Sequence, residues 1–151
     1  MENCQNMRKG LFTYQLRGAF RAYEIALGRF LQDYDLPLSH FYVLRIFWEA
    51  SGHTQRHIAD QAFMSESVLS QVLKKMIERN LVKRLPQAPK KTQLRKIVLT
   101  ETGISLRQTL LDGHELLLES FLDQENESDV DSTIKTLSTV GESLRRLNRL
   151  A

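Results

Sequence analysis

The segment from Thr54 to Thr100 constrains the fold more than any other part of the chain. Two stretches with helical spacing begin at Thr54 and Ser65, residue types that favour helix N-caps. Two short runs of strand-forming residues follow, LVKRLP and LRKIVLT, and the seven residues QAPKKTQ join them. This order predicts a helix-turn-helix followed by a two-stranded hairpin with an extended tip.

The second of these helices, Ser65 to Arg79, has two faces of different chemistry. Its apolar face consists of Leu69, Val72, Leu73 and Met76. A helix-turn-helix places its second helix in the major groove, with polar side chains near base edges and the helix N-terminus near phosphate. A Gln side chain pairs with adenine, and Lys side chains contact phosphates. We therefore predict DNA contacts from Ser65, Ser67, Ser70, Gln71, Lys74 and Lys75, with Gln71 as the base reader.

Positive charge is concentrated on the same segment. Residues 54–100 contain ten Lys or Arg and three Asp or Glu, a net charge of +7, whereas the whole chain carries +3. The net charge is +1 over residues 1–53 and −5 over residues 101–151. We predict that Lys90, Lys91 and Arg95 of the hairpin contact the DNA backbone and the minor groove. The alternative is a solvated hairpin that uses Lys to protect an exposed edge.

Long helical patterns flank this segment and predict a single mainly α domain with a small β-hairpin. Residues 1–7 show no period and are expected to form a loose extension. Apolar stripes predict helices over residues 8–33, 38–50 and 101–123. A last helix is expected to begin near Ser128, a candidate N-cap.

Several function classes find no support in the sequence. No apolar run is long enough to span a bilayer and no secretory signal is visible, so we expect a cytoplasmic protein. No catalytic, metal or cofactor motif is present, and His53 and His57 do not share a helical face if the helix starts at Thr54. We therefore expect no enzyme and no cofactor. Cys4 is the single cysteine, either a redox-sensing thiol or an inert residue of the extension.

The succession LPLSHFYVLRIF, TQRHIADQAFMSESVLSQVLKKMIERNLVKR and IVLTETG resembles the MarR family of winged helix-turn-helix transcriptional regulators. The resemblance covers most of the chain. It implies one protomer over residues 1–151, in which residues 8–35 and 101–150 form dimerisation helices and residues 36–100 bind DNA. It further implies a homodimeric repressor on a pseudopalindromic operator, with recognition helix 65–79 in the major groove and wing 81–99 near the minor groove.

The chain departs from the family at three places. The family's wing commonly carries Asp-x-Arg where this sequence has Lys91 and Gln93. The family often has Arg at the position of Gln71 and Gly at the position of Asn80. These differences imply an altered operator preference.

The resemblance also implies a small aromatic or phenolic effector, bound where the first, second and fifth helices meet. Candidate ligand-binding residues are Phe20, Arg21, Tyr23, His40 and Phe41. The alternative is that these side chains belong to the core. Two other functions stay open: a protein-interaction or dimerisation module without specific DNA binding, and a redox- or metal-responsive regulator.

Overall fold

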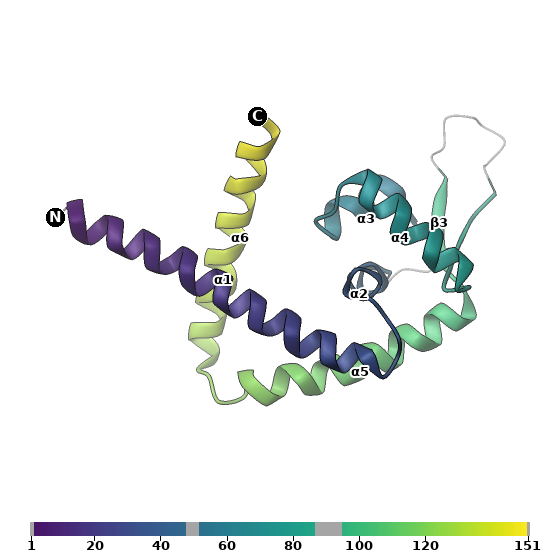
Figure 1. The fold of residues 1–151 in the computed structure, drawn as a ribbon, viewed down its shortest axis with the longest axis horizontal. Coiled ribbons are helices and arrows are strands. Elements are labelled where there is room, and N and C mark those ends of the chain that lie inside the picture. Colours follow the sequence, from purple (N-terminus) through teal and green to yellow (C-terminus); the bar gives the residue numbers. More distant parts are fainter. Residues whose placement is uncertain (1, 48–51, 87–94, 151) are drawn as a thin grey trace. The chain divides into compact units, whose positions relative to one another are not determined.

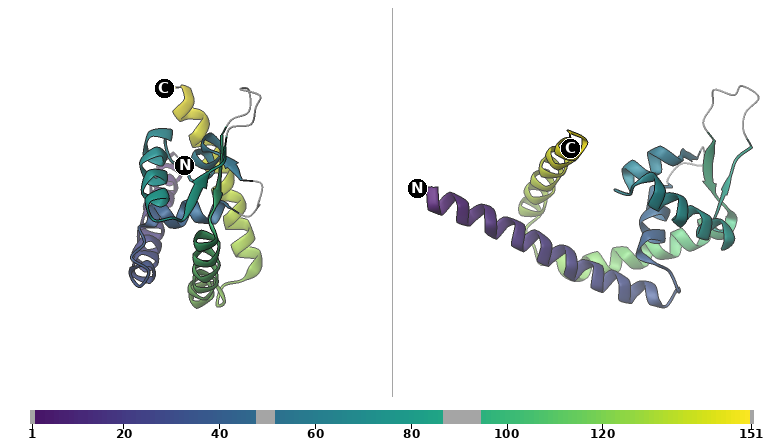
Figure 2. Two further views of the ribbon diagram at one scale, coloured as in Figure 1. Left: turned by 90° about the vertical axis from the view of Figure 1, so that its right-hand side faces the viewer. Right: turned by 45° about the horizontal axis from the view of Figure 1, so that its top comes forward.

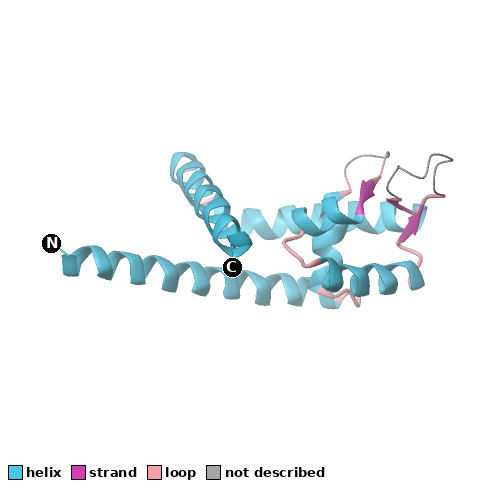
Figure 3. Cartoon of the chain, turned by 90° about the horizontal axis from the view of Figure 1, so that it is seen from above, coloured by secondary structure: helices cyan, strands magenta, loops and turns pink. Residues whose placement is uncertain are grey.

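A computed structural model describes residues 2–47, 52–86 and 95–150 of the chain (Figure 1). This part is mainly helical, with one small sheet (Figure 3). The fold class predicted from the sequence is thereby confirmed. In order, the elements are α1 (Glu2–Gln32), α2 (Leu38–Ile46), β1 (His53–Thr54), α3 (Gln55–Gln61), α4 (Glu66–Glu78), β2 (Val82–Arg84), β3 (Lys96–Leu99), α5 (Glu101–Leu122) and α6 (Glu127–Leu150).

The chain divides into two units, residues 1–112 and residues 113–151. The first unit contains α1 to α4, the sheet and the first half of α5. The second contains the rest of α5 and all of α6. Every buried apolar side chain of the described core belongs to the first unit.

Helix α1 is longer than predicted. The expected loose extension is wrong for residues 2–7, which are helical, and no Pro or Gly in that stretch interrupts the helix. Leu27 and Leu31 near its C-terminal end are fully buried, whereas Leu11 and Phe20 are each 56% exposed. Only the C-terminal end of α1 therefore packs in the core of the first unit.

Helix α2 is shorter than predicted, because the chain leaves the helical conformation at Phe47 (φ −84°, ψ 76°). The prediction of a helix to Ala50 is wrong at this position. Phe47 is 4% exposed and its ring centroid lies 5.6 Å from that of His53 at the start of β1. Tertiary packing thus overrides the helical spacing. Residues 48–51 lie outside the described residues.

The sheet has three antiparallel strands in the order β1-β3-β2, so the predicted two-stranded ribbon is incomplete. Strand β1 pairs His53 with Ile97, and β2 pairs Val82 with Leu99. A strand of two residues has no alternation for a sequence pattern to detect. Gly52 precedes it at φ +73°, where a Cβ would lie 2.5 Å from Cγ1 of Val98. Glycine is therefore required at this entry to the sheet.

The helix-turn-helix forms as predicted. The Thr54 hydroxyl accepts from His57 N (3.2 Å) and the Ser65 hydroxyl accepts from Val68 N (3.3 Å), which confirms both N-caps. The predicted inner face of α4 is buried throughout: Leu69, Val72, Leu73 and Met76. Asn80 follows α4 at φ 55°, a left-handed conformation that commonly ends a helix.

A close junction connects the end of α4 with the start of α5. Thr100 N donates to the Leu81 carbonyl oxygen (3.1 Å), and the Thr100 hydroxyl donates to the Asn80 carbonyl oxygen. The same hydroxyl accepts from Gly103 N (3.0 Å) in the first turn of α5. A Cβ at Gly103 would overlap the Leu81 carbonyl oxygen and lie 2.9 Å from its carbon. Only glycine fits between these backbones.

In the second unit, α6 begins at Glu127, and Asn126 supplies its cap by accepting from Ser128 N (2.9 Å). The prediction of Ser128 as N-cap is thus wrong by two residues. Large apolar side chains of α6 are exposed: Ile134, Leu137, Leu144 and Leu147. No helix in the described part of the chain has the length and apolar character to cross a membrane.

Candidate nucleic-acid interface

The outer face of α4 is polar and exposed. Ser67, Gln71 and Lys74 follow one another at helical spacing and are all exposed, on the side opposite the four buried residues. Glu78 continues this line at the C-terminal end of the helix. Seven residues of helix span about 10 Å, or about three base-pair steps of DNA. This face therefore has the length and chemistry to read a short stretch of a groove.

The two serines at the start of α4 hold each other in place. The Ser65 hydroxyl caps the helix and lies 3.0 Å from the Ser67 hydroxyl. Both residues are exposed beside the first turn, where unpaired backbone N–H groups favour an anion. This end of α4 offers hydrogen-bond donors to a phosphate.

A chain of hydrogen bonds links the recognition helix to the sheet. Gln55 Nε2 donates to the Ser70 hydroxyl (2.6 Å), and Arg84 Nη2 donates to Gln55 Oε1 (3.3 Å). Ser70, predicted to contact DNA, is thus also a structural contact between α4 and α3. Gln55 was not predicted as a site residue. Its partners lie 15 and 29 positions away, so no local pattern could reveal it.

Lys75 lies on a different flank of α4 from Lys74. Burial lowers the pKa of His40, and the positive charges of Arg79 and Lys75 lower it further. His40 is buried in α2 (2% exposed), and Lys75 lies about 100° round α4 from Lys74. Arg79 Nη1 donates to the Asp35 carbonyl oxygen (2.7 Å), which fixes the end of α4 to the turn after α1. Lys74, on the outer face, is the better placed of the two lysines for DNA.

Strands β2 and β3 of the wing lie beside the helix-turn-helix (Figure 2). They add positive charge there. Lys83 and Arg84 on β2, Lys96 on β3 and Arg95 just before it are all exposed. Lys90 and Lys91, predicted with Arg95 to contact DNA, lie outside the described residues.

The first unit also contains a cavity of about 530 Å³, a size common for small-molecule sites. Its walls come from α1, α2 and the end of α3 with the turn that follows: Phe20, Tyr23, Tyr42, Arg45, Ile46, Gln61, Ala62, Phe63 and Met64. From the sequence, the fifth helix (α5) is the expected third wall. In this cavity the turn between α3 and α4 takes that place.

The five predicted ligand residues separate into two groups. Phe20 and Tyr23 line the cavity. Arg21 does not, and its guanidinium lies 3.8 Å from the Glu24 carboxylate. His40 and Phe41 are buried in the core, with 2% and 0% exposure.

One side of the cavity is polar. Burial raises the pKa of Tyr23, and the positive charge of Arg45 opposes that rise. Burial also raises the pKa of Tyr42, with contributions from Tyr23 and Glu24, and Arg45 again opposes it. Arg45 lines the same cavity as these two tyrosines. The Tyr42 hydroxyl oxygen is buried and has no hydrogen-bond partner among the described residues.

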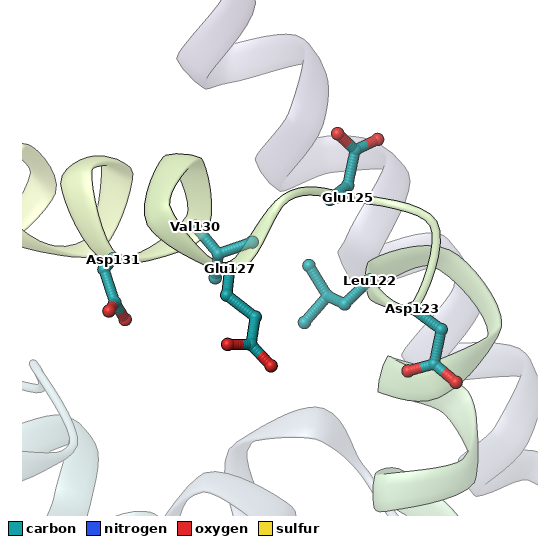
Figure 4. Close-up of a pocket in the computed structure, with 6 residues that line it drawn as sticks. All are labelled: Leu122, Asp123, Glu125, Glu127, Val130 and Asp131. Atoms are coloured by element: carbon teal, nitrogen blue, oxygen red, sulfur yellow. The ribbon is translucent and has the colours of Figure 1, made fainter.

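A second cavity, of about 500 Å³, lies in the second unit at the turn between α5 and α6 (Figure 4). Most of its lining residues are acidic, and the full lining is Leu122, Asp123, Glu125, Glu127, Val130 and Asp131. The Glu125 carboxylate points away from those of Asp123, Glu127 and Asp131, so the four do not converge on one point (Figure 4). Its charge repels a nucleic acid.

The histidine pair singled out in the sequence forms a ring stack. The centroids of the His53 and His57 rings lie 4.8 Å apart and the ring planes meet at 15°, although His53 precedes α3. No group of three or more His, Cys, Asp or Glu side chains suited to a metal ion occurs within residues 2–47, 52–86 and 95–150.

The helix-turn-helix with its three-stranded sheet defines the chain as a winged helix-turn-helix protein. Comparison with known proteins gives the family. A model of the MarR family matches residues 34–91, the segment from the end of α1 into the wing. No curated protein sequence matches the chain.

Solved structures support the same fold. The DNA complex of MepR from Staphylococcus aureus is 19% identical, with 87% of this chain and 95% of that chain covered and a TM-score of 0.77. MarR from Staphylococcus aureus, in complex with salicylate and kanamycin, is 18% identical over 93% and 94%, with a TM-score of 0.78. CouR from Rhodococcus jostii RHA1, bound to p-coumaroyl-CoA, is 21% identical over 85% and 90%, with a TM-score of 0.78.

The winged-helix segment, residues 34–91, thus matches the MarR family of transcription regulators. The resemblance drawn from the sequence is confirmed. The members of this family are regulators and not enzymes.

Proposed function

We propose that the protein is a homodimeric, sequence-specific DNA-binding repressor that binds a pseudopalindromic operator and is released by a small aromatic effector. We also propose that it has no enzymatic activity. The observation that carries DNA binding is the outer face of α4, where Ser67, Gln71 and Lys74 are exposed on a helix whose inner face is fully buried. MepR, similar in fold, has been solved bound to DNA.

The exposed apolar side chains of α6 support the homodimer. Ile134, Leu137, Leu144 and Leu147 recur at three- and seven-residue steps and are 40–63% exposed. A helix with such a stripe buries it against a partner. A second copy of the chain carries the same stripe, so a twofold dimer covers both at once.

The cavity beside α1 and α2 supports a small effector. Its volume fits a small molecule, and most of its lining is apolar or aromatic. Two proteins of similar fold were solved with salicylate and with p-coumaroyl-CoA. Release then requires that the effector binds the DNA-free conformation better than the DNA-bound one.

Replacement of Gln71, Lys74 and Lys75 by alanine, one at a time, tests the DNA-binding face. Lys74→Ala should weaken binding to every sequence and flatten its salt dependence, because it removes a phosphate contact. Lys75→Ala should weaken DNA binding less, because Lys75 lies about 100° round α4 from Lys74, off the line of Ser67, Gln71 and Lys74. Gln71→Ala should lose about 1–3 kcal/mol of binding free energy on duplexes that carry the preferred base pair and little on other duplexes. Binding is measured by fluorescence anisotropy on operator and scrambled duplexes over a range of salt concentrations.

The two lysine variants are matched controls, since they remove the same charge from adjacent positions. Equal losses of DNA affinity in the two lysine variants would contradict the proposal that the outer face of α4 binds DNA. A uniform loss in Gln71→Ala would show that Gln71 does not read a base. Full operator binding in all three would favour the alternative of a protein-interaction module.

A further inference from the structure

Gln55, at the start of α3, joins the recognition helix to the wing with both ends of its side-chain amide. Gln55 Oε1 accepts from Arg84 Nη2 (3.3 Å) on β2, and Gln55 Nε2 donates to the Ser70 hydroxyl (2.6 Å) on α4. A guanidinium has only donors, so the amide oxygen must face Arg84 and the amide nitrogen must face Ser70. The contact with Arg84 therefore fixes the direction of both hydrogen bonds.

The direction of these bonds determines what Ser70 can offer to DNA. Its hydroxyl oxygen accepts from Gln55, so its own proton is left to donate outward. Ser70 is exposed and immediately precedes Gln71, the predicted base reader. Serine hydroxyls commonly donate to the phosphate oxygens of DNA. Arg84, Gln55 and Ser70 thus form a chain of donors whose last proton suits the DNA backbone.

Arg84 faces the helices and not the far side of the sheet. It shares a face of β2 with Val82, which is 1% exposed, and it pairs with the fully buried Ile97, whereas Lys83 lies on the opposite face. The Arg84 side chain nevertheless stays exposed. Its partner Gln55 is neutral, so the contact orients the guanidinium and leaves its positive charge for a phosphate.

We propose that Gln55 is a positioning residue for DNA binding, which directs Arg84 of the wing and Ser70 of the recognition helix to the same stretch of phosphate backbone. This inference rests on the proposed regulator function and adds a residue that acts without touching DNA itself. The two partners share one amide, so the recognition helix and the wing contact the backbone as a unit. Loss of the amide therefore weakens the contacts of both.

The first experiment measures the salt dependence of DNA binding. The probe is a labelled duplex of the operator that the wild-type protein selects from random DNA, and binding is followed by anisotropy over a range of NaCl concentrations. Gln55→Met keeps the length of the side chain and removes its amide. It should weaken operator binding about fivefold, because the charge-assisted contact of Arg84 is lost.

The same variant should also flatten the slope of log affinity against log salt concentration by about 0.9, the value for one phosphate contact. This change is expected although Gln55 carries no charge. A purely structural role of Gln55 would leave the slope as it is in the wild type. An unchanged slope would therefore overturn the proposal.

The second experiment asks whether Gln55 acts through Arg84. In the Arg84→Gln background, Gln55→Met should weaken operator binding by less than about twofold, since the guanidinium that it orients is gone. Lys83→Gln is the matched control, because it removes the same charge from the neighbouring position on the opposite face of β2. In that background Gln55→Met should keep its full effect. Equal effects in the two backgrounds would contradict action through Arg84.

Gln55→Glu separates DNA binding from stability. A carboxylate accepts from Arg84 and also from Ser70, which turns the Ser70 proton inward and neutralises the guanidinium. Both contacts within the protein are kept, so Tm should be at or above that of the wild type, whereas operator affinity should fall about tenfold or more. Wild-type affinity in Gln55→Glu would show that Gln55 only supports the fold and would overturn the proposal.

Failure of the regulator function has a different signature. A wild-type protein that selects and binds no duplex would overturn that function and the role of Gln55 with it. Salt-sensitive operator binding by the wild type, unchanged in Gln55→Met, would overturn the role of Gln55 alone.

Discussion

Replacement of Gly103 by alanine is expected to destabilise the protein by on the order of 3 kcal/mol. The added Cβ meets the Leu81 carbonyl group, which is backbone and cannot rotate away. Leu81 is held there because its oxygen accepts from Thr100 N (3.1 Å). Relief of the overlap therefore requires that α5 separates from the end of α4. Thermal unfolding followed by circular dichroism should show a Tm lower by about 10 °C.

Gly28→Ala is the matched control, because Gly28 is also helical and a Cβ there meets nothing within 4 Å. Alanine has the higher helix propensity, so this variant should be slightly more stable, by about 0.5–1 kcal/mol. Equal changes in stability in Gly103→Ala and Gly28→Ala would contradict the close approach of Gly103 to Leu81.

The second large effect is expected at the exposed stripe of α6. Leu144→Asp places a charge in each copy of the proposed dimer interface, where it has no partner. The dimer dissociation constant should rise at least a hundredfold, and operator binding should fall with it, because two half-sites are no longer bound together. Analytical ultracentrifugation and anisotropy measure the two quantities on the same samples.

Thr139→Asp adds the same charge to α6 on the face away from the stripe. The Thr139 hydroxyl donates to the Lys135 carbonyl oxygen (3.0 Å) within the same helix. This variant should remain dimeric and bind the operator. A dimeric Leu144→Asp protein would contradict the assignment of the stripe to the homodimer.

The helix-turn-helix could be predicted closely because local chemistry determines it. Thr54 and Ser65 cap their helices, Asn80 ends α4, and the buried residues of α4 follow its helical period. These features depend on residues within a few positions of each other. The outer face of α4 follows from the same periodicity.

The features that were missed depend on contacts distant in sequence. Strand β1 exists because His53 and Thr54 pair with β3, and α2 ends early because Phe47 packs against His53. The contact of Gln55 with Ser70 and Arg84 joins three elements. The cavity likewise depends on the α3–α4 turn, which forms a wall with α1 and α2. Phe20 and Tyr23 line this cavity, whereas His40 and Phe41 are buried in the core.

Selection of bound sequences from random DNA by the wild-type protein tests the central claim most directly. The account predicts a pseudopalindromic sequence whose half-sites lie about one helical turn, or about 10 base pairs, apart, as two recognition helices require. Its binding should weaken steeply with added salt. Recovery of no common sequence, or of an asymmetric single half-site, would contradict a homodimeric regulator that reads DNA with α4.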